Sequence, residues 1–216
     1  MIYLISGLGT NEKAFARIDL GGRPFTFLPW IKPQRNELLD HYLDRFAAGI
    51  NPNEEIIFIG LSMGGMIAQN LAQKFKTSKI ILISSVISEK EYSMLFRFFR
   101  FTGLYKLAPV KLLLKFRFFI YQLFGASSGN EKKFLIELLA DADPQLIHWS
   151  LDIVAKWKQV FTHPPGNLYR IHGKKDPIFP HKYIGKAQLI EGGSHVMIVT
   201  KATSVNEWLK KILDEM

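Results

Sequence analysis

Ser62 has the sequence surroundings that best suit covalent chemistry in this chain. It is the middle residue of Gly60-Leu61-Ser62-Met63-Gly64, which follows the pattern Gly-x-Ser-x-Gly. A serine hydroxyl is a weak nucleophile, so it needs a base that takes its proton and N–H groups that stabilise the charge forming on the substrate. A sharp strand-to-helix turn makes room for both, and glycines relieve its crowding. The chain contains no cysteine, which excludes a thiol nucleophile.

The segments on either side of Ser62 agree with such a turn. Residues 55–59 are apolar after the first one and predict a buried strand, and residues 63–75 have the pattern of a helix with small residues in its first turns. This context is the one that the five-residue pattern requires. The alternative interpretation is an ordinary glycine-rich turn between a strand and a helix.

Short apolar runs alternate with helical patterns along most of the chain. Alternation of this kind is typical of βα units that stack into a parallel sheet. The predicted fold class is therefore α/β, a mostly parallel sheet of about six strands flanked by helices, in a single domain of residues 1–216. We expect helices at 12–20, 34–48, 63–75 and 199–216, and strands at 3–6, 25–28, 55–59, 79–84, 168–173 and 187–190.

The alternation stops at Val86. Helical patterns follow for about seventy residues without a convincing strand, after which the βα order resumes. We therefore expect an insertion into one sheet, from about Ser88 to Val160.

The order of these elements and the Ser62 pattern together resemble the α/β-hydrolase family over nearly the whole chain. In that family the catalytic residues follow in the order Ser, Asp or Glu, His, with the acid after a late strand and the histidine before the last helix. The resemblance implies Asp176 as the acid, in His172-Gly173-Lys174-Lys175-Asp176-Pro177. It implies His195 as the general base, in Glu191-Gly192-Gly193-Ser194-His195.

The same resemblance implies an oxyanion hole made by the backbone N–H groups of Leu8 and Met63. The segment Ser6-Gly7-Leu8-Gly9 departs from the family's common His-Gly opening, because serine stands where histidine is frequent. A hypothesis that follows is that Ser6 itself contacts a ligand. The remaining histidines are assigned structural or merely exposed roles: His41, His148, His163, His172 and His181.

The insertion occupies the position at which this family usually has a lid, so residues 88–160 are expected to cover the active site. Two interpretations of its many aromatic residues stay open. They form an apolar pocket for an acyl chain or a ring, or they pack the helices of the lid against one another. The residues in question are Phe96, Phe98, Phe99, Phe101, Tyr105, Phe116, Phe118, Phe119, Tyr121 and Phe124.

The insertion also carries much of the net charge of +9. A solvated face, a handle for an anionic substrate group, and a weak contact with an anionic membrane surface all remain as interpretations. Nucleic-acid binding is not expected, because the aromatic residues follow helical patterns. The acidic residues between 88 and 133 are Glu89, Glu91 and Glu131, and the basic ones are Lys90, Arg97, Arg100, Lys106, Lys111, Lys115, Arg117, Lys132 and Lys133.

Cofactors and metals are not expected. No cluster of His, Asp and Glu has metal-ligand spacing, and Gly7-Leu8-Gly9-Thr10 lacks the third glycine of a dinucleotide-binding pattern, which falls at Glu12. The beginning of the chain has no basic leader, and no apolar run reaches the length of a membrane span. We therefore expect a cytoplasmic protein. Nothing in the sequence indicates its oligomeric state.

The functional expectation is a serine hydrolase that cleaves a carboxylic ester or thioester of a small apolar substrate through an acyl-Ser62 intermediate. One alternative keeps the same three residues for acyltransfer, C–C bond hydrolysis, or a lyase or synthase step, since fold does not determine the reaction. Another is a non-catalytic lipid or membrane-surface binder on a hydrolase scaffold.

Overall fold

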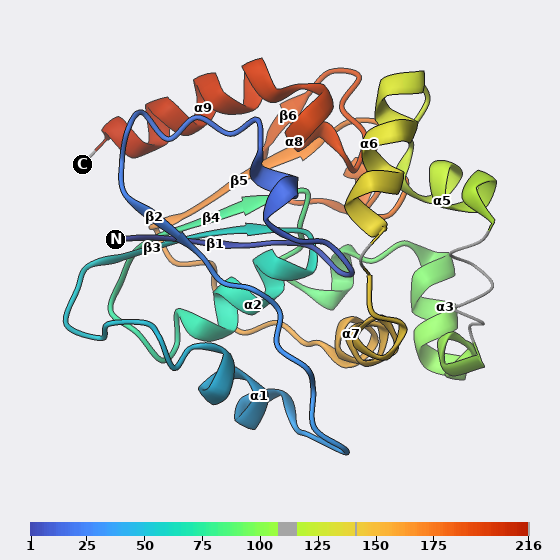
Figure 1. Ribbon diagram of the computed structural model, residues 1–216, viewed down its shortest axis with the longest axis horizontal. Helices are drawn as coiled ribbons and strands as arrows, with labels where there is room; N and C mark the ends of the chain where they lie inside the picture. The colour runs from blue at the N-terminus through green and yellow to red at the C-terminus, as the bar shows by residue number, and fades with distance from the viewer. Residues whose placement is uncertain (108–115, 141, 216) are drawn as a thin grey trace.

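Six strands form one parallel sheet in the computed structural model, which describes residues 1–107, 116–140 and 142–215 (Figure 1). The order across the sheet is β2-β1-β3-β4-β5-β6, and every neighbouring pair is parallel. The predicted fold class is confirmed. The strands are β1 (Ile2–Ile5), β2 (Phe25–Phe27), β3 (Ile56–Leu61), β4 (Thr77–Ile83), β5 (Leu168–Gly173) and β6 (Gln188–Ile190).

Helices cover both faces of the sheet, so its central strands are apolar in almost every position. Successive side chains of a strand point to opposite faces. In β1, Ile2 and Leu4 pack with α8 (Met197–Thr200) and α9 (Ala202–Asp214). Tyr3 and Ile5 pack on the other face with α1 (Leu39–Phe46) and α2 (Met63–Leu71). Figure 1 shows α1 and α2 on the opposite side of the sheet from α9.

The predicted helices have different bounds in the structure. The helix expected at 63–75 is α2, which ends at Leu71. The helix expected at 12–20 is a single 3₁₀ turn, η1 (Glu12–Phe15). After Phe15 the next buried residue is Leu20, so a longer helix would have no continuous apolar face to bury. The helix expected at 34–48 begins only at Leu39, because Asn36 has φ 57°, outside the right-handed helical region.

The closing helix expected at 199–216 is two helices, α8 and α9. The backbone of Lys201, with φ −125° and ψ 34°, separates them. Residue 216 lies outside the described part of the chain. Among the described residues, no helix has the length and apolar character to cross a membrane.

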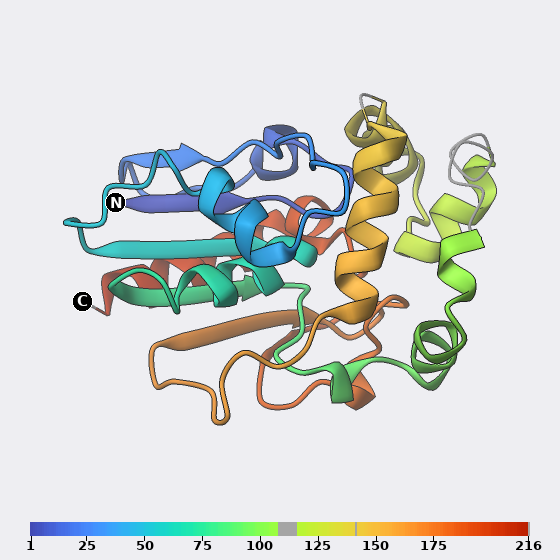
Figure 2. The ribbon, with the colours of Figure 1, turned by 90° about the horizontal axis from the view of Figure 1, so that it is seen from below.

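The described part of the segment between β4 and β5 contains helices and no strand. Figure 2 shows α7 standing across the carboxyl end of the sheet, with α3 and α5 on its far side. This segment therefore lies beyond the edge where the strand ends meet. Its helices are η2 (Glu89–Glu91), α3 (Met94–Thr102), η3 (Leu104–Leu107), α5 (Arg117–Phe124), α6 (Gly129–Leu139) and α7 (Pro144–Lys156), and η4 (His181–Tyr183) follows β5.

The strand order fixes where a ligand can bind. From β1 the chain moves to β2 on one side of it and then to β3 on the other. In sheets of this kind the loops that leave such a pair of strands diverge, and the crevice between them binds ligands. The loop after β1 carries Leu8, and the turn after β3 carries Ser62.

Candidate active site

Ser62 occupies a strained turn between β3 and α2. Its φ of 53° and ψ of −119° are unusual for a residue with a side chain. Such a conformation costs about 1–3 kcal/mol and persists only where the surroundings enforce it. Here the Ser62 N–H donates to the carbonyl oxygen of Ile83 in β4 at 2.9 Å. The turn therefore continues the sheet ladder and directs the Ser62 hydroxyl away from the sheet.

Three glycines make this turn sterically feasible. A Cβ atom on Gly60 would overlap the backbone of Gly64 and Gly65, and one on Gly64 would overlap the carbonyl oxygens of Ile5 and Ser6. A Cβ atom on Gly65 would meet the side chain of Ser85 at 2.5 Å. Larger residues are excluded by backbone packing at Gly60 and Gly64 and by the Ser85 side chain at Gly65.

Loops from three strands bring Ser62, His195 and Asp176 together. The Oγ of Ser62 lies 2.9 Å from Nε2 of His195. The Nδ1 of His195 lies 2.7 Å from Oδ2 of Asp176. Both Asp176 and His195 are buried, whereas Ser62 is partly exposed. The geometry is that of a nucleophile bonded to a base, which is bonded in turn to an orienting carboxylate.

The surroundings of Asp176 determine which nitrogen of His195 carries the proton. Oδ1 of Asp176 accepts hydrogen bonds from the backbone N–H groups of Ile178 at 2.9 Å and Phe179 at 3.0 Å. These bonds occupy Oδ1 and leave Oδ2 to accept from Nδ1 of His195. The Nε2 of His195 is then an acceptor, facing the Ser62 hydroxyl.

His172 is a buried neighbour of this group. Its Nε2 donates to the carbonyl oxygen of Phe179 at 2.7 Å and lies 3.4 Å from Oδ2 of Asp176. Burial lowers the pKa of His172 below its ordinary value, so the ring is neutral and acts as a hydrogen-bond donor to the Asp176 loop. The structural role expected for it agrees with these contacts. The remaining histidines outside the triad, His41, His148, His163 and His181, are exposed.

The assignment of the Leu8 and Met63 amides as oxyanion donors stays a prediction, and the surroundings of both residues are compatible with it. Met63 begins α2, so its N–H has no partner within the helix. Leu8, Ser62 and Met63 line one cavity, and a Cβ atom added to Gly7 would lie 3.4 Å from Cβ of Ser62. Trp30 holds the β1 loop in place, because its Nε1 donates to the carbonyl oxygen of Gly7 at 3.1 Å.

The hypothesis that Ser6 contacts a ligand is wrong. Ser6 is buried, and its hydroxyl donates to the carbonyl oxygen of Thr10 at 2.9 Å. The serine closes the β1 loop from within, whereas Gly7, Leu8 and Thr10 of this loop line the cavity.

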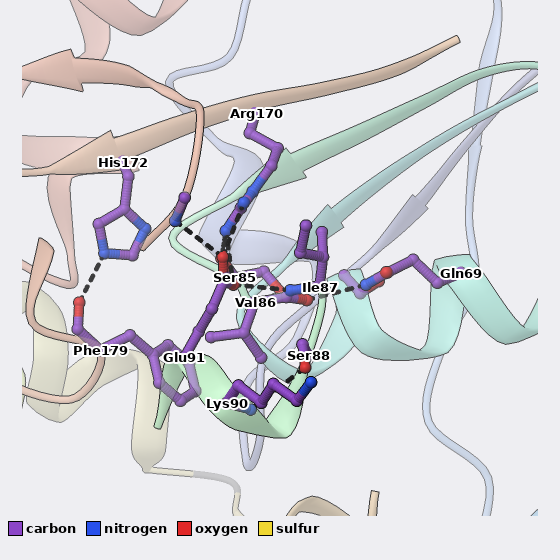
Figure 3. A network of polar contacts seen from close by, with 12 residues as sticks. Gln69, Ser85, Val86, Ile87, Ser88, Lys90, Glu91, Arg170, His172 and Phe179 are labelled. Carbon is purple, nitrogen blue, oxygen red and sulfur yellow. Dashed lines mark hydrogen bonds and ion pairs between the residues drawn. The ribbon is translucent and has the colours of Figure 1, made fainter. Parts of the chain in front are cut away.

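Two polar residues that sequence reasoning missed hold the turn from behind (Figure 3). The Ser85 hydroxyl donates to the carbonyl oxygen of Ser62 at 2.7 Å. The Nε2 of Gln69 donates to the carbonyl oxygens of Gly65 at 3.0 Å and Val86 at 2.9 Å. They join the first turn of α2 to the segment that leaves β4.

A buried ion pair continues this polar network to the start of the insertion. Arg170 of β5 and Glu91 of η2 form two hydrogen bonds, of 3.0 and 2.7 Å, and both side chains are buried (Figure 3). Glu91 also accepts the N–H groups of Ile87 at 2.9 Å and Gly185 at 2.8 Å. Arg170 reaches the carbonyl oxygen of Ser85 at 3.4 Å. The pair thus ties the beginning of the insertion to β5 and to the loop after it.

The fold and this site can be compared with known proteins. A family model described as the alpha/beta hydrolase family matches residues 10–208. The chain belongs to the alpha/beta hydrolase family. The resemblance inferred from Ser62 and the order of the elements is thereby confirmed. No curated protein matches the chain.

Solved structures of this fold superpose on nearly the whole chain. A bromoperoxidase from Bacillus anthracis has a TM-score of 0.72 at 18% identity, over 99% of this chain and 91% of that one. An esterase from Exiguobacterium antarcticum has a TM-score of 0.69 at 17% identity, again over 99% of this chain and 91% of that one. At such low identity the likeness shows the fold alone.

A cavity of about 360 Å³ opens at Ser62 and His195, within the usual size range of ligand pockets. The insertion contributes a large part of its wall. Lining side chains include Leu95 of α3, Leu123 of α5, Leu138 of α6 and Leu151 of α7.

Few of the residues that line the cavity have polar side chains. Apart from Ser62 and His195, the described lining residues with polar side chains are Thr10 and Ser93. The Thr10 hydroxyl donates to the carbonyl oxygen of Gly7 at 2.9 Å, and that of Ser93 accepts from the N–H of Phe96 at 3.1 Å. Among the described lining residues no side chain is charged, so the interpretation of basic residues as a handle inside the pocket finds no support there.

The aromatic residues of the insertion divide between cavity and surface. Phe96, Phe99 and Phe124 line the cavity, and Phe124 also contacts the His195 ring edge-on, with the ring centres 5.7 Å apart. Phe98 and Phe101 face solvent. Both interpretations of the aromatics are therefore incomplete, because several rings form the pocket and others remain uncovered. The side chain of Phe119, together with Lys111 and Lys115, lies outside the described part of the chain.

Proposed function

We propose that the protein is a serine esterase that hydrolyses a carboxylic ester or thioester with an uncharged, apolar acyl group. The observation that carries the proposal is the pair of contacts from Ser62 through His195 to Asp176 beside a cavity with a largely apolar lining. Family membership supports hydrolysis as the reaction class.

The proposed reaction has two halves. His195 Nε2 takes the hydroxyl proton as Ser62 Oγ attacks the carbonyl carbon of the ester, and the N–H groups of Leu8 and Met63 stabilise the resulting oxyanion. The protonated imidazole, stabilised by Asp176, then gives this proton to the leaving alcohol or thiol. Water attacks the acyl-Ser62 ester in the second half, again with His195 as the base.

The apolar lining of the cavity favours the acyl part of the substrate as its occupant. The cavity wall of aliphatic and aromatic side chains provides hydrophobic binding, about 0.8 kcal/mol for each buried CH₂ group. A charged group there would lose its hydration without gaining a counter-ion. We therefore propose that linear or cyclic hydrocarbon acyl groups enter the cavity.

The helical segment of residues 88–160 is, in this proposal, a lid on a single domain. Support comes from Phe124, which contacts His195, and from Gly125, which lies so close to Ser194 and Pro177 that a Cβ atom there would be 3.0 and 3.2 Å from them. The segment thereby excludes bulk water from the loops that carry the acid and the base.

A fluorophosphonate probe tests the proposal most directly. The probe should label the wild-type chain and fail to label Ser62→Ala, and hydrolysis of p-nitrophenyl butyrate should fall in kcat by about 10⁴ to 10⁶ in that variant. Ser194→Ala is the matched control, since it removes a buried hydroxyl beside His195 that has no hydrogen-bond partner among the described residues. Absence of labelling in the wild type would contradict the nucleophile.

The same assay separates hydrolysis from acyltransfer. Addition of a primary alcohol should leave the acid as the main product if water is the acceptor. Labelling of Ser62 combined with transfer of the acyl group to the alcohol, and little acid, would instead assign the site to an acyltransferase. Labelling without turnover of any ester would point to the lyase or C–C hydrolase alternatives.

A further inference from the structure

Helix α3 is the most exposed apolar element of the described chain. Its nine residues, Met94–Thr102, include two aliphatic side chains and four phenylalanines, and none of the nine is buried. Phe101 is 92% exposed and Met94 is 74% exposed. Burial of one such side chain is worth about 1.5–3 kcal/mol, and this free energy is not gained in the isolated chain. A patch of this kind marks an interaction surface.

Neighbouring elements extend the exposed surface. Leu104 of η3 and Leu123 of α5 are also exposed. Figures 1 and 2 both show α3 and α5 at the end of the molecule that lies farthest from the two chain termini. We refer to Met94, Leu95, Phe98, Phe101, Leu104 and Leu123 together as the outer apolar patch.

A cluster of cations adjoins this patch. An open pocket of about 530 Å³ is lined by Arg100, Lys106, Lys156 and Lys158, and Phe101 of the outer apolar patch lines it too. Two acids lie nearby: Asp152 pairs with Lys156 at 2.6 Å, and Glu89 interacts electrostatically with Arg100 and Lys158. Four cations against two carboxylates leave the pocket positively charged.

We propose that this end of the molecule docks on an anionic lipid bilayer. The outer apolar patch enters the boundary between head groups and acyl chains, and the cationic pocket faces the lipid phosphates. Apolar side chains beside cations are what an interfacial element requires, and each cation near such a surface contributes about 1 kcal/mol. The excess positive charge favours a bilayer over a second copy of this chain, which carries the same charge at the same place.

The docking surface and the cavity share side chains. Leu95, Phe99 and Leu123 are exposed at the surface and also line the cavity at Ser62. The mouth of the cavity therefore faces the proposed bilayer, and an apolar ester reaches Ser62 without crossing water. The entry of an ester from the bilayer rests on the proposed function, whereas the docking of the protein on the bilayer does not.

Flotation of the full chain with lipid vesicles tests the docking. We expect binding to vesicles of phosphatidylcholine with phosphatidylglycerol, weaker binding to phosphatidylcholine alone, and loss of the difference at high salt. The variant Met94→Ser/Phe98→Ser/Phe101→Ser should reduce binding at least 100-fold. The variant Lys106→Glu/Lys158→Glu should reduce it about 10-fold or more on the anionic vesicles alone.

Matched controls change equally exposed residues elsewhere. Phe25→Ser/Leu38→Ser removes two exposed apolar side chains of the sheet region, and Lys210→Glu/Lys211→Glu reverses two exposed charges on α9. Both should bind vesicles as the wild type does. Hydrolysis of a soluble short-chain ester should be unchanged in every variant, which separates failure of docking from failure of the proposed function.

Two results would overturn the inference. One is the absence of binding to anionic vesicles, or binding that the patch and pocket variants leave unchanged. The other is a dimer in sedimentation experiments that the triple serine variant dissociates, because the outer apolar patch would then be covered by a second copy of the chain.

Discussion

The hydroxyl of Ser85 donates a 2.7 Å hydrogen bond to the carbonyl oxygen of Ser62. Ser62 is the residue at which β3 becomes α2, and Ser85 is the second residue beyond the end of β4. The segment that follows β4 thus stabilises Ser62 in a backbone conformation that the residue would not adopt alone. Because the carbonyl belongs to the same residue, this contact restrains the backbone from which the Ser62 side chain extends toward His195.

Ser85→Ala should therefore impair catalysis without preventing folding. We expect kcat for p-nitrophenyl butyrate to fall about 10-fold, the equivalent of one lost hydrogen bond, with KM little changed. Ser84→Ala is a matched control, since Ser84 is also buried and its hydroxyl has no partner among the described residues. Equal effects of the two substitutions would contradict a positioning role for Ser85.

Gly64→Ala should abolish activity and destabilise the fold. A Cβ atom there overlaps two backbone carbonyl oxygens, which cannot move without shifting β1. We expect a loss of at least about 3 kcal/mol in the free energy of unfolding in urea. Gly49→Ala serves for comparison, because no atom lies within 4 Å of its added Cβ; that variant should remain within about 0.5 kcal/mol of the wild type.

Leu151→Trp should restrict hydrolysis to esters with shorter acyl chains. Leu151 lines the cavity from α7, and a larger ring there occupies space that a longer acyl chain needs. We expect kcat/KM for p-nitrophenyl octanoate to fall about 10-fold or more relative to the acetate. Gln145→Trp places the same ring on an exposed position of α7 and should leave this ratio unchanged.

Glu91→Gln should destabilise the protein strongly. The substitution leaves Arg170 buried with an uncompensated charge, which costs about 3–5 kcal/mol. Chemical unfolding should show a lower midpoint in this variant, whereas Lys74→Met, which breaks an exposed pairing with Asp40 and Asp44, should cost no more than about 1 kcal/mol. A small effect of Glu91→Gln would mean that the pair is accessible to water.

Stability should decrease as the pH falls below the ordinary pKa of histidine, about 6.5. Burial lowers the pKa of His172 in the folded state, so the unfolded chain binds a proton there at a higher pH than the folded chain does. Protonation therefore favours unfolding, and the contribution is fully present only above that pH. His172→Gln should flatten the dependence of the urea midpoint on pH between 5 and 7; an unchanged slope would assign it to other groups.

The sequence was sufficient to predict those features that depend on local patterns. Ser62, Asp176 and His195 each follow an apolar strand and have glycine or proline close by in the sequence. Their positions at one edge of the sheet therefore follow from the order of the elements. The strands were predictable because burial on both faces requires continuous apolar runs. Catalysis by these residues remains a prediction for the experiments above.

Features that depend on contacts between distant segments were not predictable. The hydrogen bond of Ser85 has no sequence pattern, and the adjacent Ser84, which makes no such bond among the described residues, would have looked equally suitable. The pairing of Glu91 with Arg170 joins residues 79 positions apart. Helix lengths were overestimated where backbone conformation decided them, as at Asn36. Helical periodicity likewise did not distinguish the buried Ile120 from the exposed Phe101.

The distance along the chain between Ser62 and His195 bears on how the protein is synthesised. Their side chains are hydrogen-bonded although 133 positions separate them. The whole helical segment between β4 and β5 lies between them in the sequence. A ribosome therefore produces the strained turn long before the histidine that would activate it. The nascent chain cannot complete the constellation until β6 has joined the sheet, so an interrupted translation product would retain the serine but lack its base.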